Sequence, residues 1–397
     1  MAASPYRVLL QAPAVRWQAL AGLLAQTTQG AGGIGIILVI RGEAGSLALA
    51  GVVVGVLSVS AGVARPVQGR LIDTRGARGL MALCGIAHPA ALAAIVALAD
   101  GHAPGAALLA MGVIAGITLP PVSTCMRVVW GTAMGGGDRT AAYSLVYLTQ
   151  ELAILAGPLL LAAVISAADA SAALVTVAAV ACAGTLGFAL SLPPGLARGG
   201  AAPRAGGGAV LRAPGVPALV ATAVLVGGVI GGVQVGVPTF ASAHHAPAAS
   251  GVLIAVLSIG GIAGAAIYGG GRWRRAPSPR LLGLLAALSV AVAITVAAES
   301  LAVLGAALAL AGLVLNPSLT TISLHVDWHV SRASAAEAFG WLSTGIATGT
   351  GAANAIAGVL SHPGDPRPAF VVATVAAVAA TLLVGAFQRT LARGYSR

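Results

Sequence analysis

Long apolar runs separated by short polar breaks dominate the chain. A helix that crosses a hydrocarbon core of about 30 Å needs about 20 residues, and the runs have that length. Residues 301–314 are apolar on every face, which excludes the alternating pattern of a membrane β-barrel. The pattern predicts an all-α membrane protein with twelve transmembrane helices, at residues 18–40, 46–68, 80–98, 106–129, 141–165, 172–192, 216–241, 251–270, 281–298, 301–325, 335–360 and 369–387.

The composition supports a membrane protein, because 58% of the residues are hydrophobic, 8% are charged and the mean hydropathy is +0.96. Soluble domains carry roughly 25% charged residues. All 21 basic residues are arginines, and the net charge is +11. If the N-terminus is cytoplasmic, all of them except Arg41 and Arg367 fall at the cytoplasmic face, as the positive-inside rule requires. We therefore expect a multi-pass protein of the cell membrane, with both termini in the cytoplasm and no nucleic-acid partner.

No residue pattern indicates an enzyme, a cofactor or a metal site. The three cysteines lie in three separate apolar runs, where a thiol packs as a small apolar group. His325 and His329 flank Asp327, but a cytoplasmic helix end accounts for this spacing better than metal ligands do. Because the chain has no lysine, it lacks the phosphate-binding loop that ATP hydrolysis requires.

The chain divides into two halves that repeat each other. Residues 193–214 are rich in Gly and Pro and carry three arginines, which predicts a cytoplasmic linker between an N-terminal six-helix bundle (1–192) and a C-terminal one (215–397). Related six-helix units should show internal sequence similarity. At an offset of 200 residues the matching pairs are Gly51/Gly251, Val56/Val256, Leu57/Leu257, Ser58/Ser258 and Gly69/Gly269. At an offset of 196 residues they are Gly116/Gly312, Pro121/Pro317 and the aromatic pair Tyr143/Phe339.

A charged island, residues 69–78, interrupts this apolar chain between the second and third predicted helices. It holds one carboxylate, Asp73, and three arginines. At the repeat-related place, residues 269–275 keep glycine and arginine but have no aspartate. The island could orient the protein in the membrane or act in gating.

Two six-helix repeats, a basic linker and a glycine-bounded charged turn together resemble the major facilitator superfamily over essentially the whole chain, in particular its 12-helix efflux members. The signature of that family matches at Gly69, Leu71, Asp73, Gly76 and Arg78, whereas Thr74 replaces a basic residue. The resemblance implies a gating motif in which Asp73 meets the start of the eleventh helix in an outward-facing state. The complete motif comprises Gly69, Arg70, Asp73, Arg75, Gly76 and Arg78. Ser334 and Glu337 have capping-box spacing at that helix start, so we expect them to cap it.

Glu151 is predicted deep within the fifth helix. An unpaired charge there costs about 3 kcal/mol, so the carboxyl should face a cavity, be protonated or have a partner. Tyr143, Tyr147 and Glu151 follow one another at four-residue steps and share one helix face. Glu151 is therefore the candidate for proton coupling, and the alternative is a neutral carboxyl bonded within the bundle.

Gly157 and Pro158 resemble the core of the fifth-helix antiporter motif, and a Gly-Pro pair permits a helix bend. The glycine pair expected after it is replaced by Leu161 and Ala162. The fourth helix also lacks the mid-helix arginine of drug antiporters, since Arg127 lies near its cytoplasmic end.

Neutral polar residues within predicted spans are candidates for the substrate cavity, because the resemblance implies that the first and seventh helices line it. Each could instead bond between helices, which is worth about 0.6 kcal/mol. The candidates are Gln26, Gln29, Tyr147, Gln234, Asn316 and Asn354.

These features predict a secondary active transporter that works by alternating access, as a monomer in the lipid bilayer. We expect a proton-coupled exporter of a hydrophobic or weakly cationic small molecule, because no buried arginine cluster for an anionic substrate is apparent. An importer of a nutrient or metabolite in the same fold remains open, and so does a membrane sensor that does not transport.

Overall fold

The computed structural model describes residues 5–44, 46–133, 139–198, 208–273, 276–361 and 365–393. The described residues are helical without strands, and the expected all-α fold with twelve spanning segments is confirmed. The spans are α2 (Pro13–Ala25) with α3 (Thr27–Ala44), α4 (Leu47–Arg75), α5 (Ala77–Asp100), α6 (Gly105–Ile117) with α7 (Val122–Ala133), α8 (Arg139–Ala167), α9 (Ala170–Leu190), α11 (Val216–Ala243), α12 (Ala249–Gly270), α13 (Pro277–Val296), α14 (Leu301–His329), α15 (Ala335–Leu360) and α16 (Arg367–Arg393).

Short elements complete the described chain: α1 (Pro5–Gln11), α10 (Pro194–Arg198), η2 (Ala209–Arg212) and η3 (Arg332–Ser334). Of the predicted linker, residues 199–207 lie outside the described residues, and so do Arg274 and Arg275 of the repeat-related turn. Within the part of the chain that the structure describes, eleven spans are long and apolar enough to cross a membrane. The twelfth, α15, carries Gly, Ser, Thr and Asn along its length.

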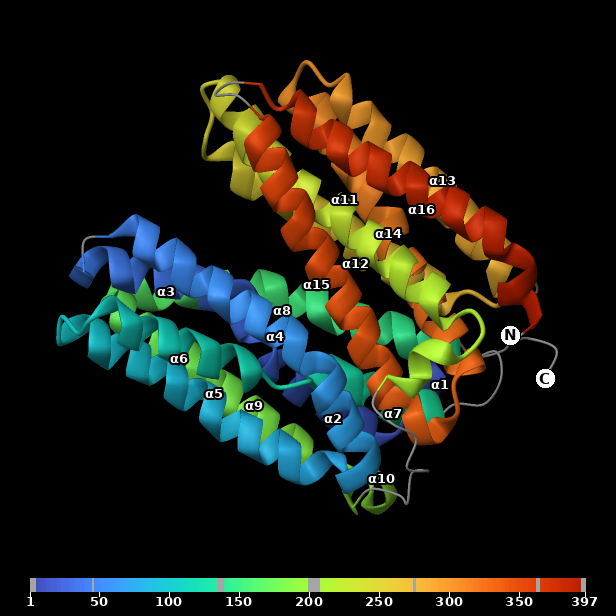
Figure 1. The fold of residues 1–397 in the computed structure, drawn as a ribbon, viewed down its shortest axis with the longest axis horizontal. Helices are drawn as coiled ribbons and strands as arrows, with labels where there is room; N and C mark the ends of the chain where they lie inside the picture. The colour runs from blue at the N-terminus through green and yellow to red at the C-terminus, as the bar shows by residue number, and fades with distance from the viewer. Residues whose placement is uncertain are drawn as a thin grey trace. The chain divides into compact units, whose positions relative to one another are not determined.

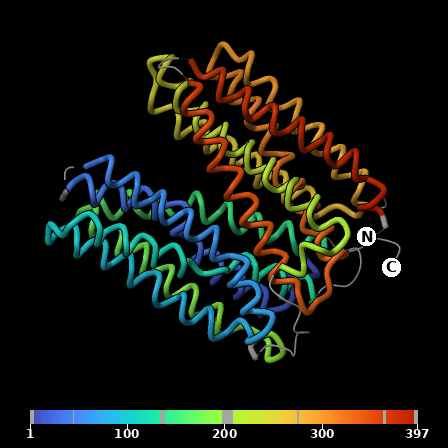
Figure 2. The backbone as a smooth tube through the Cα atoms, viewed as in Figure 1, coloured from blue at the N-terminus to red at the C-terminus, as the bar shows by residue number. Residues whose placement is uncertain are grey.

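The helices grouped by their contacts form two compact units. Unit 1 comprises Met1–Arg7, Met134–Leu148 and Ala205–Arg397, and unit 2 comprises Val8–Ala133 and Thr149–Arg204. In unit 1, α11 packs on α15 and α16, while α12 and α13 pack on α14 (Figure 1). In unit 2, α5 packs on α9 and α4 on α6. The backbone trace in Figure 2 follows the helices of unit 1 from α11, in yellow-green, to α16, in red.

Two expected helices are each broken into two, the first at Gln26 between α2 and α3, and the fourth between α6 and α7. The fourth predicted span stops at Ile117 and resumes at Val122, because Pro120 and Pro121 have no N–H to continue the ladder. The carbonyls left at the break would be costly in an apolar bundle. Gln68 Nε2 donates to Ile117 O at 2.8 Å and to Leu119 O at 3.1 Å, and Arg65 Nη1 donates to Leu119 O at 3.2 Å. The polar side chains of α4 therefore compensate the break.

Glycines let helices touch backbone to backbone, and the arrangement repeats. In unit 2, a Cβ on Gly30 would overlap Ile154 O, and one on Gly157 would overlap Thr27 O. In unit 1, a Cβ on Gly227 would overlap Ile346 O, and one on Gly349 would overlap Val224 O. Reciprocal glycines thus join α3 to α8 and α11 to α15, which are the first and fifth spans of each repeat. Small residues at such crossings are the usual basis of helix packing in lipid.

A second glycine contact confirms the sequence repeat. Gly116 of α6 lies against Leu57 O of α4, and Gly312 of α14 lies against Leu257 O of α12. Both members of each contact are the repeat-related residues that the sequence offsets match. The repeated positions are therefore points of close helix approach in both units.

Gly349→Ala should destabilise the protein by about 1–3 kcal/mol, because the new methyl group overlaps the α11 backbone. Detergent-solubilised protein measured by fluorescence-detected thermal unfolding should show a lower midpoint. Gly351→Ala is the matched control, since nothing lies within 4 Å of a Cβ at that position on the same helix. Equal midpoints for the two variants would contradict the close-contact account.

Candidate functional site

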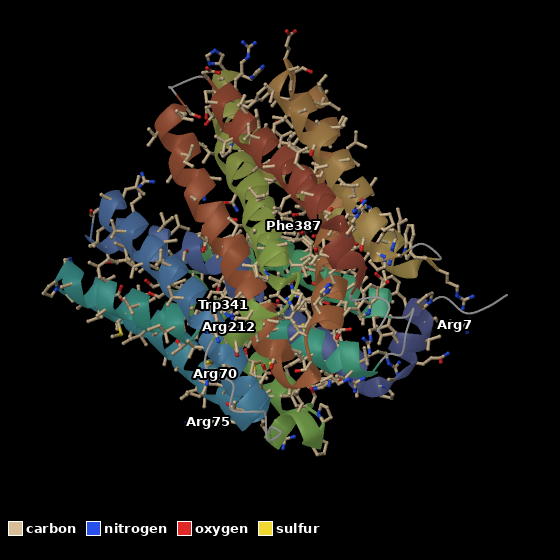
Figure 3. All side chains as sticks on the ribbon, turned by 45° about the vertical axis from the view of Figure 1, so that its right-hand side comes forward. Arg7, Arg70, Arg75, Arg212, Trp341 and Phe387 are labelled. Carbon is tan, nitrogen blue, oxygen red and sulfur yellow. The ribbon has the colours of Figure 1, made fainter. Side chains whose placement is uncertain are left out.

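The charged island is mainly helical. We expected a turn between the second and third helices, but α4 continues to Arg75 and the turn is reduced to Gly76. The prediction of a longer turn was wrong because residues 70–75 are helix-compatible and reach beyond the apolar part of the span. Arg70 and Arg75 are exposed near the C-terminal end of α4 (Figure 3), and Asp73 is half-buried.

Gly76 makes the joint between α4 and α5. Its φ of 90° and ψ of 158° lie in a region that only glycine occupies readily. The Gly76 N–H donates to Ile72 O at 3.0 Å, so the residue caps α4 before α5 begins at Ala77. The motif glycine is therefore required by backbone conformation.

Arg78 and Thr74 have local structural roles. Arg78 Nε donates to Ala189 O at 3.3 Å and Nη2 donates to Leu192 O at 3.0 Å, so its guanidinium satisfies carbonyls at the end of α9. The Thr74 hydroxyl donates to Arg70 O at 2.8 Å within α4. The gating role of the motif, which comprises Gly69, Arg70, Asp73, Arg75, Gly76 and Arg78, stays a prediction.

The predicted capping box at the start of α15 is wrong. Ser334 belongs to the η3 turn, and its φ of −134° and ψ of 17° differ from the extended cap geometry, so its side chain makes no cap hydrogen bond. Glu337 Oε1 instead accepts a hydrogen bond from the Gly208 N–H at 2.9 Å. The carboxylate at this helix start therefore holds the end of the linker segment.

Glu151 is half-buried near the middle of α8, a continuous helix. Helix geometry places Tyr143 and Tyr147 on the same face as Glu151, about two turns and one turn nearer the start of α8. Tyr147 is 6% exposed, and its hydroxyl lies 3.1 Å from Ser323 Oγ of α14. Because the Ser323 hydroxyl donates to Leu319 O at 3.0 Å, Tyr147 is the donor in this pair.

Further polar contacts join the first turns of α8 to α14 within unit 1. Arg139 forms an ion pair with Asp327, and the Tyr143 hydroxyl hydrogen bonds to the same carboxylate. Ser144 Oγ donates to Thr320 Oγ1 at 3.4 Å. We call these contacts, with the Tyr147–Ser323 pair, the α8–α14 seam. Sequence reasoning missed the seam, although the run of Ser and Thr residues from 318 to 323 was a signal for it.

The N-terminal helix α1 adds a contact in the same unit. Tyr6 Oη donates to Ala265 O at 2.6 Å, and a Cβ on Gly269 would overlap this hydroxyl. Burial raises the pKa of the Tyr6 phenol to about 12, so it stays a neutral donor. Gly269, the counterpart of Gly69, thus accommodates a tyrosine ring, a contact that no pattern along the chain predicts.

The candidates for the cavity differ in their surroundings. Gln26 is 1% exposed, and its amide donates to Gly22 O at 2.9 Å and accepts from Gln29 Nε2 at 3.4 Å. Gln29 itself is exposed. Asn316 is buried in α14. The amides in α11 and α15 meet, as Asn354 Nδ2 donates to Gln234 Oε1 at 3.2 Å, with Gln234 exposed.

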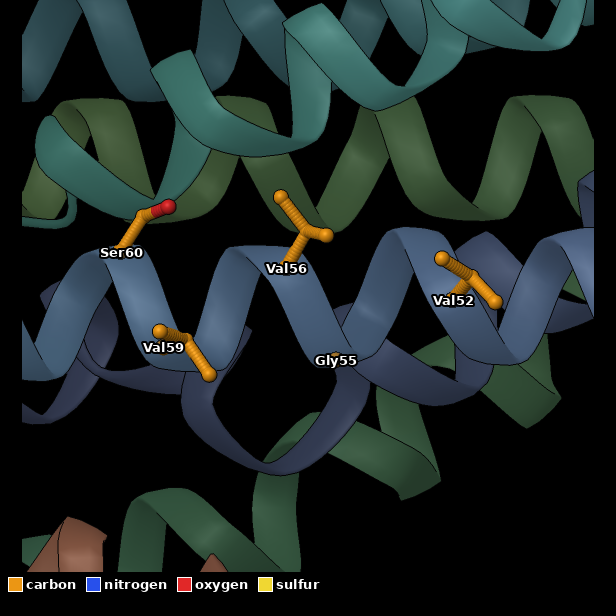
Figure 4. Close-up of a pocket in the computed structure, with 5 residues that line it drawn as sticks. All are labelled: Val52, Gly55, Val56, Val59 and Ser60. Atoms are coloured by element: carbon orange, nitrogen blue, oxygen red, sulfur yellow. The ribbon is translucent and has the colours of Figure 1, made fainter.

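One shallow depression of about 350 Å³ lies along α4 alone. Figure 4 shows its lining, which consists of Val52, Gly55, Val56, Val59 and Ser60. The lining is almost entirely apolar, and Val52 and Val59 are among the exposed large side chains. It shares no residue with the polar candidates above.

Comparison with known proteins agrees with this architecture. The family model described as "Major Facilitator Superfamily" matches residues 19–335. No curated protein sequence matches the chain. Among solved structures, a bacterial homologue of the iron transporter ferroportin in an outward-facing state is similar, with a TM-score of 0.77 and 15% sequence identity. The alignment covers 96% of this chain and 99% of that protein's chain.

Two further structures are similar over nearly their whole length. The human organic anion transporter MFSD10 has a TM-score of 0.71 at 17% identity and covers 96% of this chain and 100% of its own. The E. coli fucose:proton symporter FucP has a TM-score of 0.74 at 12% identity, with coverages of 95% and 98%. At these identities the similarity establishes the fold alone.

Gly76→Ala should lower stability by about 1–3 kcal/mol, because any side chain is strained at that backbone conformation. The measurement is the thermal midpoint of purified protein together with its yield in the membrane fraction. Gly79→Ala, three residues on in α5, has open space at its Cβ and should leave the midpoint unchanged or raise it. A Gly76→Ala protein as stable as Gly79→Ala would show that the strained joint is unimportant.

Proposed function

The chain belongs to the major facilitator superfamily, and on this premise we propose that it is a proton-coupled exporter of a hydrophobic or weakly cationic small molecule. It is a multi-pass membrane transporter and not an enzyme. In the proposed cycle, two six-helix halves, 1–192 and 215–397, move about a central substrate site and expose it to each side of the membrane in turn.

The position of Glu151 is the observation that supports proton coupling most directly. It lies near the middle of α8, whereas the other acidic residues of the described helices lie at or near helix ends. An ionisable group at that depth is costly and is usually functional in transporters. A carboxyl there can bind a proton from one side of the membrane and release it to the other. The Tyr147 hydroxyl, one turn away, donates to Ser323 and can accept a hydrogen bond from the protonated carboxyl.

The chemistry of the candidate contacts supports an uncharged or weakly cationic substrate. Gln29 and Gln234 are exposed amides, and Gln234 is held by Asn354. Amides donate and accept hydrogen bonds without imposing a charge. With Glu151 as the acidic member, such a set suits a largely apolar molecule with a few polar groups or one amine.

The proposed direction is export. Gly157 and Pro158 resemble the antiporter motif of the fifth helix, and Gly157 packs directly on α3. Import is the second candidate, because one structurally similar protein is a fucose:proton symporter. Counterflow in proteoliposomes distinguishes a transporter of either direction from a membrane sensor, which would bind its ligand without flux.

Glu151→Gln should abolish transport driven by a pH gradient, because the amide cannot carry a proton. Substrate counterflow, which needs no net proton movement, should persist. The measurement compares the two fluxes in proteoliposomes, using a compound identified by screening a deletion strain for altered susceptibility.

Glu299→Gln is the matched control, since Glu299 is exposed between α13 and α14 and should leave both fluxes unchanged. Transport by Glu151→Gln that still follows an imposed pH gradient would rule out Glu151 as the coupling residue.

Asp73→Asn tests the gating motif. We propose that the Asp73 carboxylate interacts with the N–H groups and positive dipole at the start of α15 in one state of the cycle. The variant should insert normally yet transport at least about tenfold more slowly, the effect of losing ~1.4 kcal/mol in one state. Asp100→Asn, an exposed change at the end of α5, should transport like the parent. If Asp73→Asn and Asp100→Asn both transport at the wild-type rate, the charged island at residues 69–78 serves only to orient the protein in the membrane.

A further inference from the structure

Two segments of the first sequence repeat make their contacts with the second repeat. Residues 5–7 and 139–148 precede the linker and fall in the first sequence repeat, yet their contacts group them with unit 1, which holds the second repeat. If the repeats move as bodies during transport, as the proposed function requires, these are the contacts that must change. The later part of α8, from Thr149, groups with unit 2.

The α8–α14 seam provides four polar side-chain contacts of residues 139–148. Two join neutral hydroxyls, Tyr147 with Ser323 and Ser144 with Thr320, and in a third the Tyr143 hydroxyl donates to the Asp327 carboxylate. The charged contact is the ion pair of Arg139 with Asp327, whose side chains are 19% and 16% exposed. Their partial burial makes this contact stronger than a solvated surface pair.

Asp327 is the member of the seam whose charge can change. A carboxylate can take up a proton in the pH range in which proteins are folded, whereas a guanidinium group keeps its charge there. The groups around Asp327 are Arg139 and Tyr143 from α8 and Arg332 from η3. On its own helix, His329 is turned to the His325 carbonyl, which its Nδ1 contacts at 2.7 Å.

We propose that Asp327 is a second proton-binding site, and that its protonation releases the first turns of α8 from α14. When the carboxylate binds one proton it loses its charge, the attraction to Arg139 falls, and the carboxyl competes as a donor with the Tyr143 hydroxyl. The same proton leaves when the ion pair forms again. Asp327 thereby makes the seam dependent on pH, and this role rests on the proposed transport cycle.

The phenyl ring of Phe339 links the seam to the start of α15. The Tyr143 ring lies 5.8 Å from the Phe339 ring, centroid to centroid. Both residues are buried, and they are the repeat-related pair of the fifth and eleventh helices. Movement of Tyr143 away from Asp327 must therefore disturb the packing of α15, which connects the protonation site to a second helix of unit 1.

The test is the accessibility of Ser144, which is fully buried in the seam. Ser144→Cys is introduced into a chain whose three native cysteines are replaced by serine or alanine. Maleimide labelling is measured from pH 8 to pH 5 and divided by the rate for the denatured protein at each pH. Thr185→Cys, equally buried in α9 of unit 2, is the control site.

Labelling at Ser144→Cys should rise about tenfold as the pH falls, and labelling at Thr185→Cys should stay constant. Adding Asp327→Asn should make labelling at residue 144 high at every pH, because the amide is neutral throughout. Asp327→Glu, which keeps the charge and guards against misfolding of the asparagine variant, should retain the pH dependence.

No change of labelling with pH, or equally low labelling with Asp327→Asn, would overturn the proposal. Glu151→Gln separates this outcome from failure of the proposed function. If Asp327 acts as stated, labelling in Glu151→Gln still responds to pH although coupled transport is lost. If Asp327 has no such role while Glu151→Gln alone abolishes coupling, the transport proposal stands and the seam is structural.

Discussion

Backbone contact at glycine positions is the constraint on which the rest of the structure depends. Helices in lipid gain little from hydrophobic burial against one another, so their association depends on close packing and on hydrogen bonds. Gly30 and Gly157 set the approach of α3 to α8, and Gly227 and Gly349 set that of α11 to α15. The same type of contact holds α4 to α6 and α12 to α14. The two repeats therefore share these close contacts, although only the first has an aspartate in its charged island.

Tight glycine contacts leave few places for polar groups, and several of those present bond to backbone carbonyls. Arg65 and Gln68 satisfy the carbonyls at the α6–α7 break, and Arg78 satisfies those at the end of α9. α8 differs from these structural cases, because its residues divide between the two units, it carries Glu151 near its middle and it begins with the residues of the α8–α14 seam. One helix thus combines the proposed coupling residue with the contacts that we propose are broken during transport.

Apolar runs cut at their polar and charged breaks predicted the twelve spans, and the 200- and 196-residue offsets predicted their repetition. Helix ends were less accurate: α4 extends to Arg75 because charged residues can continue a helix beyond the apolar region. Long-range partners were not predictable. Glu337 was expected to cap its own helix but accepts from Gly208, and Arg139 pairs with Asp327, 188 residues away. Such pairs depend on which helix faces meet, and a single sequence does not contain that information.

The central claim is that the first turns of α8 must leave α14 during transport. Ser144 Oγ and Thr320 Oγ1 lie 3.4 Å apart, so cysteines at these two positions can form a disulfide in a chain without other cysteines. The measurement is substrate flux in proteoliposomes before oxidation, after oxidation and after reduction. The account predicts that the cross-link stops transport and that reduction restores it. Undiminished flux through quantitatively cross-linked protein would contradict it.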